Sequence, residues 1–432
     1  MRFSTALVTA AAVLVGGCST TGSQLQQSAV ASTGRVDPVL IDRTLKSFID
    51  SGELVGVSAL IYQHGKQAYF GAFGMADREA KRPMTRDTIV RIYSMTKPVT
   101  GVALMTLWEQ GKFRLDDPVA KYIPELANVR VYAGTDASGN IVTVPVRRPM
   151  TIRDLTRHTS GLTYCSNDNL PELKPLCDKV DPRNINNTLD QFAQKLGMLP
   201  LEYQPGTQWK YSFAADVQAL LVQRLAGEPY EQYIQDKVLK PLGMTHTRIY
   251  LPENERNKLA TVYEWHPDDT FTPAPEQDSF RLNTSHRPLT PGGYGLTSTL
   301  DDYSRFTRML LNGGELDGVR VLQPQTVQMM STSQLDPAIT NREWLDADKG
   351  QMGFGIDFAV RVAPPKTSDE KAGEVGEFFW DGFANTLFWV DPKNDLTAVL
   401  FTQYQPFGKV PLHKAFRDAV YATVDPDALA PQ

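Results

Sequence analysis

Two residues one helical turn apart, Ser94 and Lys97, form the pattern in this chain best suited to chemistry. They open an apolar run that predicts a helix from about Met95 to Gln110. Residues three apart on a helix share a face, so the Lys97 amine can reach the Ser94 hydroxyl. A serine hydroxyl needs a neighbouring base before it attacks a carbonyl carbon. The pair therefore predicts a nucleophilic serine.

An accidental match is the alternative, because the same spacing recurs at Ser368 and Lys371 in a hydrophilic loop. A lysine amine is protonated at neutral pH unless burial or a nearby cation lowers its pKa, so a second proton-handling group is expected. Tyr211 is the candidate, since it lies just ahead of a helix predicted near Phe213. Its alternative role is that of an ordinary core aromatic residue.

Composition excludes several classes of protein. The chain has 432 residues, 41% of them hydrophobic, and a net charge of -5 without long basic runs. This is a globular composition with no electrostatic footprint for nucleic acid. The six histidines are scattered, and none pairs at metal-ligand spacing. We expect neither a metal nor a cofactor.

The N-terminus reads as a secretory signal peptide over residues 1–17, with a basic start and a short apolar stretch. Val15-Gly16-Gly17-Cys18 resembles a bacterial lipobox, which would make Cys18 a lipidated first residue followed by a polar tether over 18–38. Plain signal cleavage is the alternative. The prediction is an exported lipoprotein of the cell envelope, on the periplasmic side or in the outer membrane.

Two further cysteines, Cys165 and Cys177, lie in one loop rich in Asn, Asp and Pro. An even count in an exported chain favours a disulfide between them. Two free thiols are the alternative.

The order of the predicted elements indicates an α+β fold. Helices and strands at both ends of the chain surround a long helical middle, which predicts one antiparallel sheet flanked by terminal helices, with an all-helical domain inserted into it. We expect a catalytic domain over 39–425, with sheet parts at 39–90 and 285–425 and a helical part at 91–284, followed by a tail at 426–432. The predicted strands are 55–62, 67–73, 354–362, 387–390 and 396–402, and the terminal helices are 40–49 and 413–424.

Several short motifs resemble the serine β-lactamase-related superfamily, and most closely its class C-like (family VIII) carboxylesterases. The resemblance covers nearly everything after about residue 40 and implies the two-domain fold of β-lactamases and penicillin-binding transpeptidases. The motifs are Tyr93-Ser94-Met95-Thr96-Lys97, His158-Thr159-Ser160-Gly161-Leu162, Tyr211-Ser212-Phe213, Lys240-Pro241-Leu242-Gly243-Met244, Gly292-Gly293-Tyr294-Gly295-Leu296 and Phe388-Trp389-Val390-Asp391-Pro392.

The resemblance implies a role for each site residue. Ser94 would be acylated, and Lys97 and Tyr211 would share the proton transfers, with the identity of the base left open. The backbone N–H groups of Ser94 and Phe383 would form the oxyanion hole.

The family's third motif maps to Trp380-Asp381-Gly382, which would contact the substrate. Its first position is usually a cation that holds a substrate carboxylate, and tryptophan carries no charge. Trp380 fits the esterase branch, whereas Asp381 departs from the glycine common there.

These observations favour a serine hydrolase that cleaves short-chain carboxylic esters through an acyl-serine intermediate. Its expected partners are a small-molecule ester and, through Cys18, a membrane. Two alternatives stay open: a β-lactamase or D-amino-acid peptidase of the envelope, and a non-catalytic penicillin-binding-like surface protein.

Overall fold

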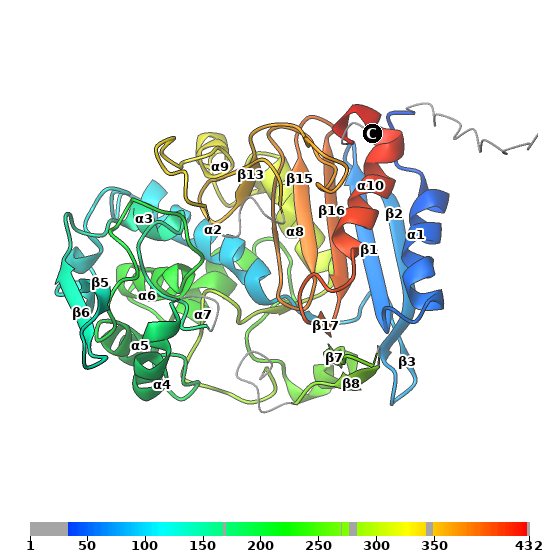
Figure 1. The fold of residues 1–432 in the computed structure, drawn as a ribbon. Helices are drawn as coiled ribbons and strands as arrows, with labels where there is room; N and C mark the ends of the chain where they lie inside the picture. Colours follow the sequence, from blue (N-terminus) through cyan, green and yellow to red (C-terminus); the bar gives the residue numbers. More distant parts are fainter. Residues whose placement is uncertain (1–32, 167–169, 269, 276–282, 343–348, 430–432) are drawn as a thin grey trace, which may run out of the picture. The chain divides into compact units, whose positions relative to one another are not determined.

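The computed structural model describes residues 33–429 apart from 167–169, 269, 276–282 and 343–348 (Figure 1). An eight-stranded sheet has the order β12-β13-β14-β15-β16-β1-β2-β3, with every neighbouring pair antiparallel. Its strands are β1 (Gly56–Gln63), β2 (Lys66–Asp77), β3 (Arg82–Pro83), β12 (Met352–Phe354), β13 (Ala359–Arg361), β14 (Phe378–Asp381), β15 (Leu387–Asp391) and β16 (Leu396–Thr402). Both ends of the chain therefore build one sheet, and the predicted α+β fold is confirmed.

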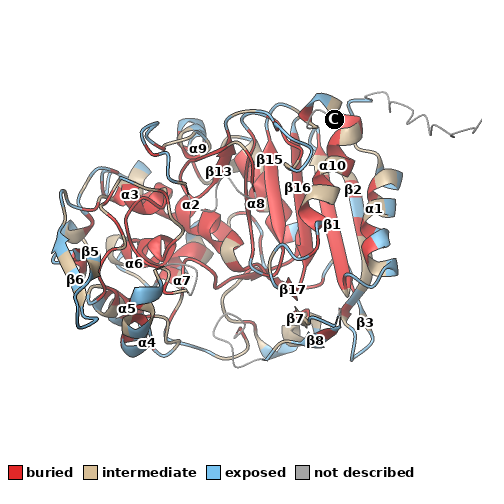
Figure 2. Ribbon diagram, in the orientation of Figure 1, coloured by how far each residue is buried: buried red, intermediate tan, exposed pale blue. Residues whose placement is uncertain are grey.

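Helices cover both faces of this sheet. Trp389 on β15 packs against Phe416 of α10 (Leu412–Val424), with ring centroids 5.4 Å apart. The adjacent Phe388 packs against Tyr303 of α8 (Leu300–Leu311), at 5.2 Å. Successive strand residues face opposite sides, so α10 and α8 lie on opposite faces. The helix α1 (Pro38–Asp50) lies beside α10, and Figure 2 shows the strands between these helices as buried.

The middle of the chain is mainly helical and centres on α2 (Thr96–Glu109), which packs against α6 (Ala214–Ala226). Both helices are apolar on most sides, as expected for helices enclosed by others. The other helices of this region are α3 (Ile152–Thr156), α4 (Lys174–Val180), α5 (Leu189–Leu196) and α7 (Tyr230–Ile234).

The expectation of an all-helical insertion is wrong in one respect, because β5 (Arg130–Thr135) and β6 (Ile141–Pro145) form an antiparallel hairpin there. Gly139, at φ +80°, sits in the turn between them.

The remaining elements are β4 (Val90–Arg91), β7 (Tyr263–Trp265), β8 (Phe271–Pro273), β9 (Thr297–Ser298), β10 (Glu315–Leu316), β11 (Val319–Arg320), β17 (Tyr404–Gln405) and α9 (Pro324–Met330).

The single strand predicted over 354–362 is instead two short strands, β12 and β13. The Gly355 N–H donates to the Phe358 carbonyl at 2.8 Å and closes a turn between them. Asp357 takes a left-handed φ of +57° in this turn, a conformation that aspartate tolerates better than most residues. The turn brings the Asp357 carboxyl group into the protein interior, where it is 1% exposed.

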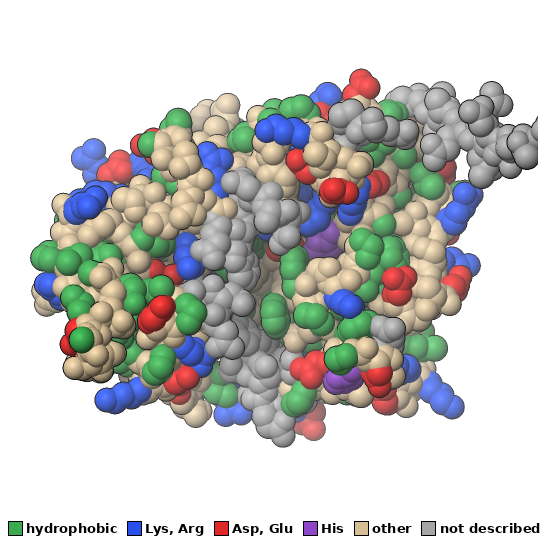
Figure 3. Space-filling model, in the orientation of Figure 1, with side chains coloured by type: hydrophobic (Ala, Val, Ile, Leu, Met, Phe, Trp, Pro, Cys, Tyr) green, Lys and Arg blue, Asp and Glu red, His purple; other side chains and the backbone are tan. Residues whose placement is uncertain are grey.

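The outer surface mixes charges of both signs, as Figure 3 shows for one face. In the part of the chain that the structure describes, no helix combines the length and apolar character needed to cross a membrane. The predicted signal peptide and Cys18 lie outside the described residues, as do residues 18–32 of the predicted tether. The proposed domain boundaries stay a prediction.

Candidate active site

Ser94 lies in a single 3-10 turn, Tyr93–Met95, that connects β4 to α2. Tyr93 has a left-handed φ of +45°, so the chain bends sharply just before the serine. The Met95 carbonyl accepts a hydrogen bond from the Tyr303 hydroxyl at 2.8 Å, and Thr96 Oγ1 accepts one from the Leu296 N–H at 3.1 Å. These bonds tie the start of α2 to α8 and to the segment before β9.

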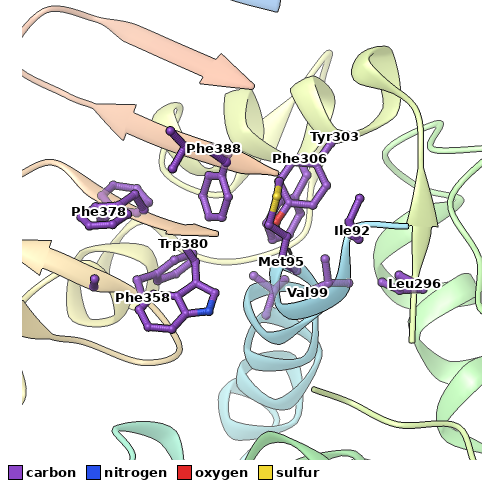
Figure 4. Close-up of a cluster of buried hydrophobic side chains, with 14 of the residues drawn as sticks. Ile92, Met95, Val99, Leu296, Tyr303, Phe306, Phe358, Phe378, Trp380 and Phe388 are labelled. Atoms are coloured by element: carbon purple, nitrogen blue, oxygen red, sulfur yellow. Dashed lines mark hydrogen bonds between the residues drawn. The ribbon is translucent and has the colours of Figure 1, made fainter. Parts of the chain in front are cut away.

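A buried apolar cluster fixes the same helix start from the other side. Figure 4 shows Met95 of the 3-10 turn and Val99 of α2 among Trp380 of β14, Phe358 of the β12–β13 turn and Tyr303 of α8. Interiors of this kind pack as densely as organic crystals, so the position of Ser94 is set by rigid neighbours.

Lys97 lies one turn along α2 and is 1% exposed. Its Nζ atom is 3.2 Å from Ser94 Oγ and 2.7 Å from the Gly293 carbonyl oxygen, to which it donates. Burial lowers the pKa of Lys97 from 10.5 to about 8, and the charges of Asp216, Asp357 and Asp381 oppose that shift. A neutral amine next to the serine is therefore accessible near physiological pH.

Asp216 lies in the first turn of α6 and binds the Gly293 backbone, to which Lys97 is hydrogen-bonded. Its Oδ1 accepts the Gly293 N–H at 2.9 Å, while the Gly293 carbonyl accepts from Lys97. Burial raises the pKa of Asp216 to about 6, and the Lys97 charge works against that rise. The partner of this helix-start carboxylate is therefore the Gly293 backbone.

Tyr211 lies directly beside the pair, with its ring centroid 4.4 Å from Lys97 Nζ. Its ring also contacts those of Tyr164 at 5.4 Å, His158 at 4.8 Å and Trp380 at 5.6 Å. Burial is the main cause that raises the pKa of Tyr211 well above 10, so its phenol stays protonated at neutral pH. The structure thus brings Ser94, Lys97 and Tyr211 together.

His158 is buried behind Tyr211 and supports it. Its Nδ1 is 3.3 Å from Ser212 Oγ, and its backbone carbonyl accepts from the Tyr203 hydroxyl at 3.1 Å. His158 has a φ of +55°, and burial lowers its pKa well below 6.5, so the ring is neutral. Such a residue acts on the site through the position of Tyr211.

The third motif lies at the end of β14, in the hairpin that leads to β15. The Gly382 N–H donates to the Thr386 carbonyl at 2.8 Å, and the Asn385 N–H donates back to the Gly382 carbonyl at 2.8 Å. A side-chain carbon at Gly382 would lie 2.5 Å from the Ile92 carbonyl oxygen, so only glycine permits this approach. The close contact places Gly382 next to Ile92, two residues before Ser94. The oxyanion hole formed by the N–H groups of Ser94 and Phe383 stays a prediction.

Behind this hairpin, His413 Nε2 donates to the Asn385 carbonyl at 2.9 Å. Burial lowers the pKa of His413 to about 3, which leaves the ring neutral. The histidine therefore anchors the turn that carries Phe383 by a hydrogen bond rather than by charge.

The sequence alone did not predict three of the side chains that lie near the site. Lys349 forms an ion pair with Asp381, Asp357 lies under α2, and Tyr164 packs on Tyr211. Tyr164 follows the His158 motif closely in the sequence, which was a usable signal. Lys349 and Asp357 meet the site only through the tertiary fold.

Cys165 and Cys177 form a disulfide in the structure, with Cα atoms 5.7 Å apart. Cys165 directly follows Tyr164, so the bridge restrains the loop that carries a ring of the site. Within the described residues, no cluster of three or more His, Cys, Asp or Glu side chains could hold a metal ion.

Comparison with known proteins finds relatives that match most of the chain. Uncharacterized protein MT1414 of Mycobacterium tuberculosis (strain CDC 1551 / Oshkosh) is 36% identical over 373 residues, covering 84% of this chain and 89% of the relative. Esterase EstB of Burkholderia gladioli is 29% identical over 399 residues, covering 88% and 94%. The solved structure of EstCE1, a hydrolase with promiscuous acyltransferase activity, matches with a TM-score of 0.71 at 27% identity and covers 89% of this chain and 98% of its own.

The resemblance inferred from the motifs is thereby confirmed, and relatives of this chain include an esterase and a hydrolase with acyltransferase activity. The family model that matches is described as beta-lactamase and spans residues 41–422. The chain belongs to the beta-lactamase family.

Proposed function

We propose that the protein is a serine esterase that cleaves short-chain carboxylic esters through an acyl-Ser94 intermediate. The observation that carries the proposal is the buried Lys97, whose Nζ lies 3.2 Å from Ser94 Oγ and whose pKa is lowered to about 8. A lysine in this state is a base poised near its operating pH, as general-base catalysis requires.

In the first half of the reaction, Lys97 takes the proton of the Ser94 hydroxyl as Oγ bonds to the ester carbonyl carbon. The carbonyl oxygen becomes an oxyanion, which the N–H groups of Ser94 and Phe383 stabilise. The bond to the alcohol oxygen then breaks, and the alcohol leaves with a proton from the site. Water attacks the acyl-Ser94 carbonyl in the same way, giving the acid and restoring the Ser94 hydroxyl.

Tyr211 is better suited to act as the general acid than as the general base. Its pKa, raised well above 10 by burial, keeps the phenol protonated, whereas Lys97 with a pKa of about 8 loses its proton more readily. Tyr211 therefore donates a proton toward the leaving alcohol, and Lys97 reprotonates it.

The surroundings of the site favour an uncharged ester over a β-lactam. Trp380 occupies the motif position where β-lactamases carry a cation, and its ring packs against Tyr211 at 5.6 Å. EstB is called an esterase, and the chain matches 94% of its length, which supports the same choice.

The direct test is hydrolysis of p-nitrophenyl acetate, butyrate and octanoate by the purified protein and by Ser94→Ala. The native protein should prefer the shorter esters and Ser94→Ala should lose hydrolysis. Tyr211→Phe should lower kcat by at least about 100-fold if the phenol transfers a proton. Activity retained by Ser94→Ala would refute the proposal, and nitrocefin turnover faster than ester turnover would favour a β-lactamase. A folded protein that a fluorophosphonate fails to label at Ser94 would favour a non-catalytic role.

We further propose that the protein is exported from the cytoplasm, is anchored to a membrane by a lipid at Cys18, and hydrolyses esters there. The Cys165–Cys177 disulfide supports an oxidising compartment. Metabolic labelling with a radioactive fatty acid should mark the native protein and leave Cys18→Ala unlabelled. Equal labelling of both proteins would exclude Cys18 as the attachment site.

A further inference from the structure

A buried ion pair lies immediately next to the proposed active site. The Lys349 ammonium contacts the Asp381 carboxylate, and the two residues are only 5% and 7% exposed. Asp381 is the residue in which the third motif departs from related esterases. The structure therefore pairs an unexpected acid with a cation that the motif itself does not contain.

The cation lies one aromatic ring away from the reacting groups. Lys349 Nζ is 4.8 Å from the centroid of the Trp380 ring, and the ring of Tyr211 lies 5.6 Å from the same Trp380 ring. The rings of Phe379 and Phe407 lie 5.8 and 5.5 Å from the same Nζ atom. Aromatic faces stabilise an ammonium without neutralising it, so the Asp381 carboxylate is its charge partner.

Lysine side chains supply the positive charge around Asp381. Burial acts to raise the pKa of Asp381, but Lys349 is the largest of the opposing influences, Lys371 adds to it, and the net effect is a lowered pKa. His413 is neutral because burial lowers its pKa to about 3. An ionised Asp381 therefore cancels the ammonium of Lys349 at the point where the motif lacks a cation of its own.

We propose that Asp381 is a specificity-determining residue, which neutralises Lys349 and so restricts the site to uncharged esters. This inference rests on the proposed esterase function. An uncompensated ammonium in a poorly hydrated site attracts a carboxylate strongly, since charge-assisted hydrogen bonds are the stronger ones. Removal of the Asp381 charge should consequently admit substrates that carry a carboxylate.

Three acetate esters that differ only in one meta substituent test this directly: methyl 3-acetoxybenzoate is neutral, 3-acetoxybenzoate is anionic and 3-acetoxy-N,N,N-trimethylanilinium is cationic. The native protein should prefer the neutral ester. Asp381→Asn should raise kcat/KM for the anionic ester relative to the neutral one by about 10-fold or more, the range of a charged hydrogen bond. Salt should weaken the gain.

A second variant, at Lys349, tests whether the preference depends on the balance between the two charges. Lys349→Met leaves the Asp381 carboxylate without its partner and should shift the preference toward the cationic ester. The double variant should return to the native preference, because neither charge remains. Asp236→Asn, which changes a partly exposed acid in the π-helix Gln235–Leu239, alters net charge equally and should leave the preference unchanged.

Since removal of one partner from a buried pair destabilises a protein, thermal unfolding identifies which variants fold. The proposal is overturned if the single variants that fold keep the native charge preference, or if the double variant keeps the shift of Asp381→Asn. If the native protein hydrolyses the neutral ester but the variants show no such shift in charge preference, this inference is refuted and the esterase function is not. Absence of turnover of all three esters refutes it together with the esterase function.

Discussion

Lys97 donates a shorter hydrogen bond to the Gly293 carbonyl, at 2.7 Å, than the 3.2 Å that separates its Nζ from Ser94 Oγ. A neutral amine has two N–H bonds and one lone pair. The Gly293 carbonyl occupies one N–H bond and so helps to turn the lone pair toward the serine. Because Asp216 accepts the Gly293 N–H, the orientation of the base depends on the backbone of the Gly292-Gly293-Tyr294-Gly295-Leu296 motif.

The pH dependence of ester hydrolysis should report the ionisation of Lys97. Its pKa is lowered to about 8 by burial, and only the neutral amine accepts the Ser94 proton, so kcat/KM should rise with pH through this value. Lys97→Met should lower kcat by about 1,000-fold and remove this limb. Initial rates with p-nitrophenyl butyrate from pH 6 to 9, corrected for spontaneous hydrolysis, provide the measurement. A flat profile for the native protein over that range would exclude Lys97 as the base.

A second buried carboxyl group, Asp357, should make the stability of the protein depend on pH. A side-chain carbon added at Gly101, one turn beyond Lys97, would lie 2.6 Å from Asp357 Oδ2. Burial raises the pKa of Asp357 from 3.8 to about 8. Between these values the folded protein keeps a proton that the unfolded chain has lost, so the free energy of unfolding falls as pH rises through this window.

Asp357→Asn should lose less stability than the native protein between pH 5 and pH 8. The amide cannot ionise, yet its oxygen can still accept the 3.0 Å hydrogen bond from Gln218. Urea unfolding at pH 5, 6.5 and 8 measures the effect, with Asp369→Asn at an exposed position as the control. If Asp357→Asn and the native protein lose stability in parallel, Asp357 does not titrate in this window.

Local sequence patterns were sufficient to predict the helix that carries Lys97 and several elements of the sheet region. The α2 helix, the β1–β2 hairpin and the α10 helix follow from apolar periodicity and from glycine at the turns, which act over a few residues. The approach of Ser94 to Lys97 is equally local, since one helical turn separates them.

Contacts between distant parts of the chain could not be predicted in this way. Lys349 meets Asp381 across 32 positions, and Gln218 meets Asp357 across 139. Neither pair has a spacing that marks it, because the sheet and the helical region must first fold to bring them together. The β5–β6 hairpin is not predicted for a different reason: its two strands have only 6 and 5 residues, too few for alternation to distinguish them from loops between helices.

Gly382→Ala should impair catalysis by displacing the oxyanion hole. The added carbon would lie 2.5 Å from the Ile92 carbonyl oxygen and 2.1 Å from Thr386 Oγ1, so the end of β14 must move away from the Ser94 turn. Loss of one oxyanion donor typically lowers kcat by about 100- to 1,000-fold. Steady-state kinetics should show that fall in kcat with a smaller change in KM. A variant that folds normally and keeps native kcat would show that the Phe383 N–H does not contribute.

Loss of the Cys165–Cys177 disulfide should affect both stability and turnover. The bridge closes a loop across 12 positions, and removal of a bridge of this kind costs about 2 to 4 kcal/mol of unfolding free energy. Tyr164, next to Cys165, packs on Tyr211 at 5.4 Å, so release of the loop should also lower kcat.

Cys177→Ser and the native protein treated with dithiothreitol should behave alike in urea unfolding and in ester hydrolysis. Dithiothreitol should have no effect on Cys177→Ser, because the bridge is already absent, and that comparison separates reduction of the disulfide from any other action of the thiol. If the native protein unfolds at the same urea concentration with and without the reductant, and mass spectrometry shows the thiols free, then the bridge does not stabilise the loop. If stability falls but kcat stays at its native value, the packing of Tyr164 on Tyr211 is maintained by neighbouring rings such as Phe213, at 4.8 Å, and the bridge serves the fold rather than the reaction.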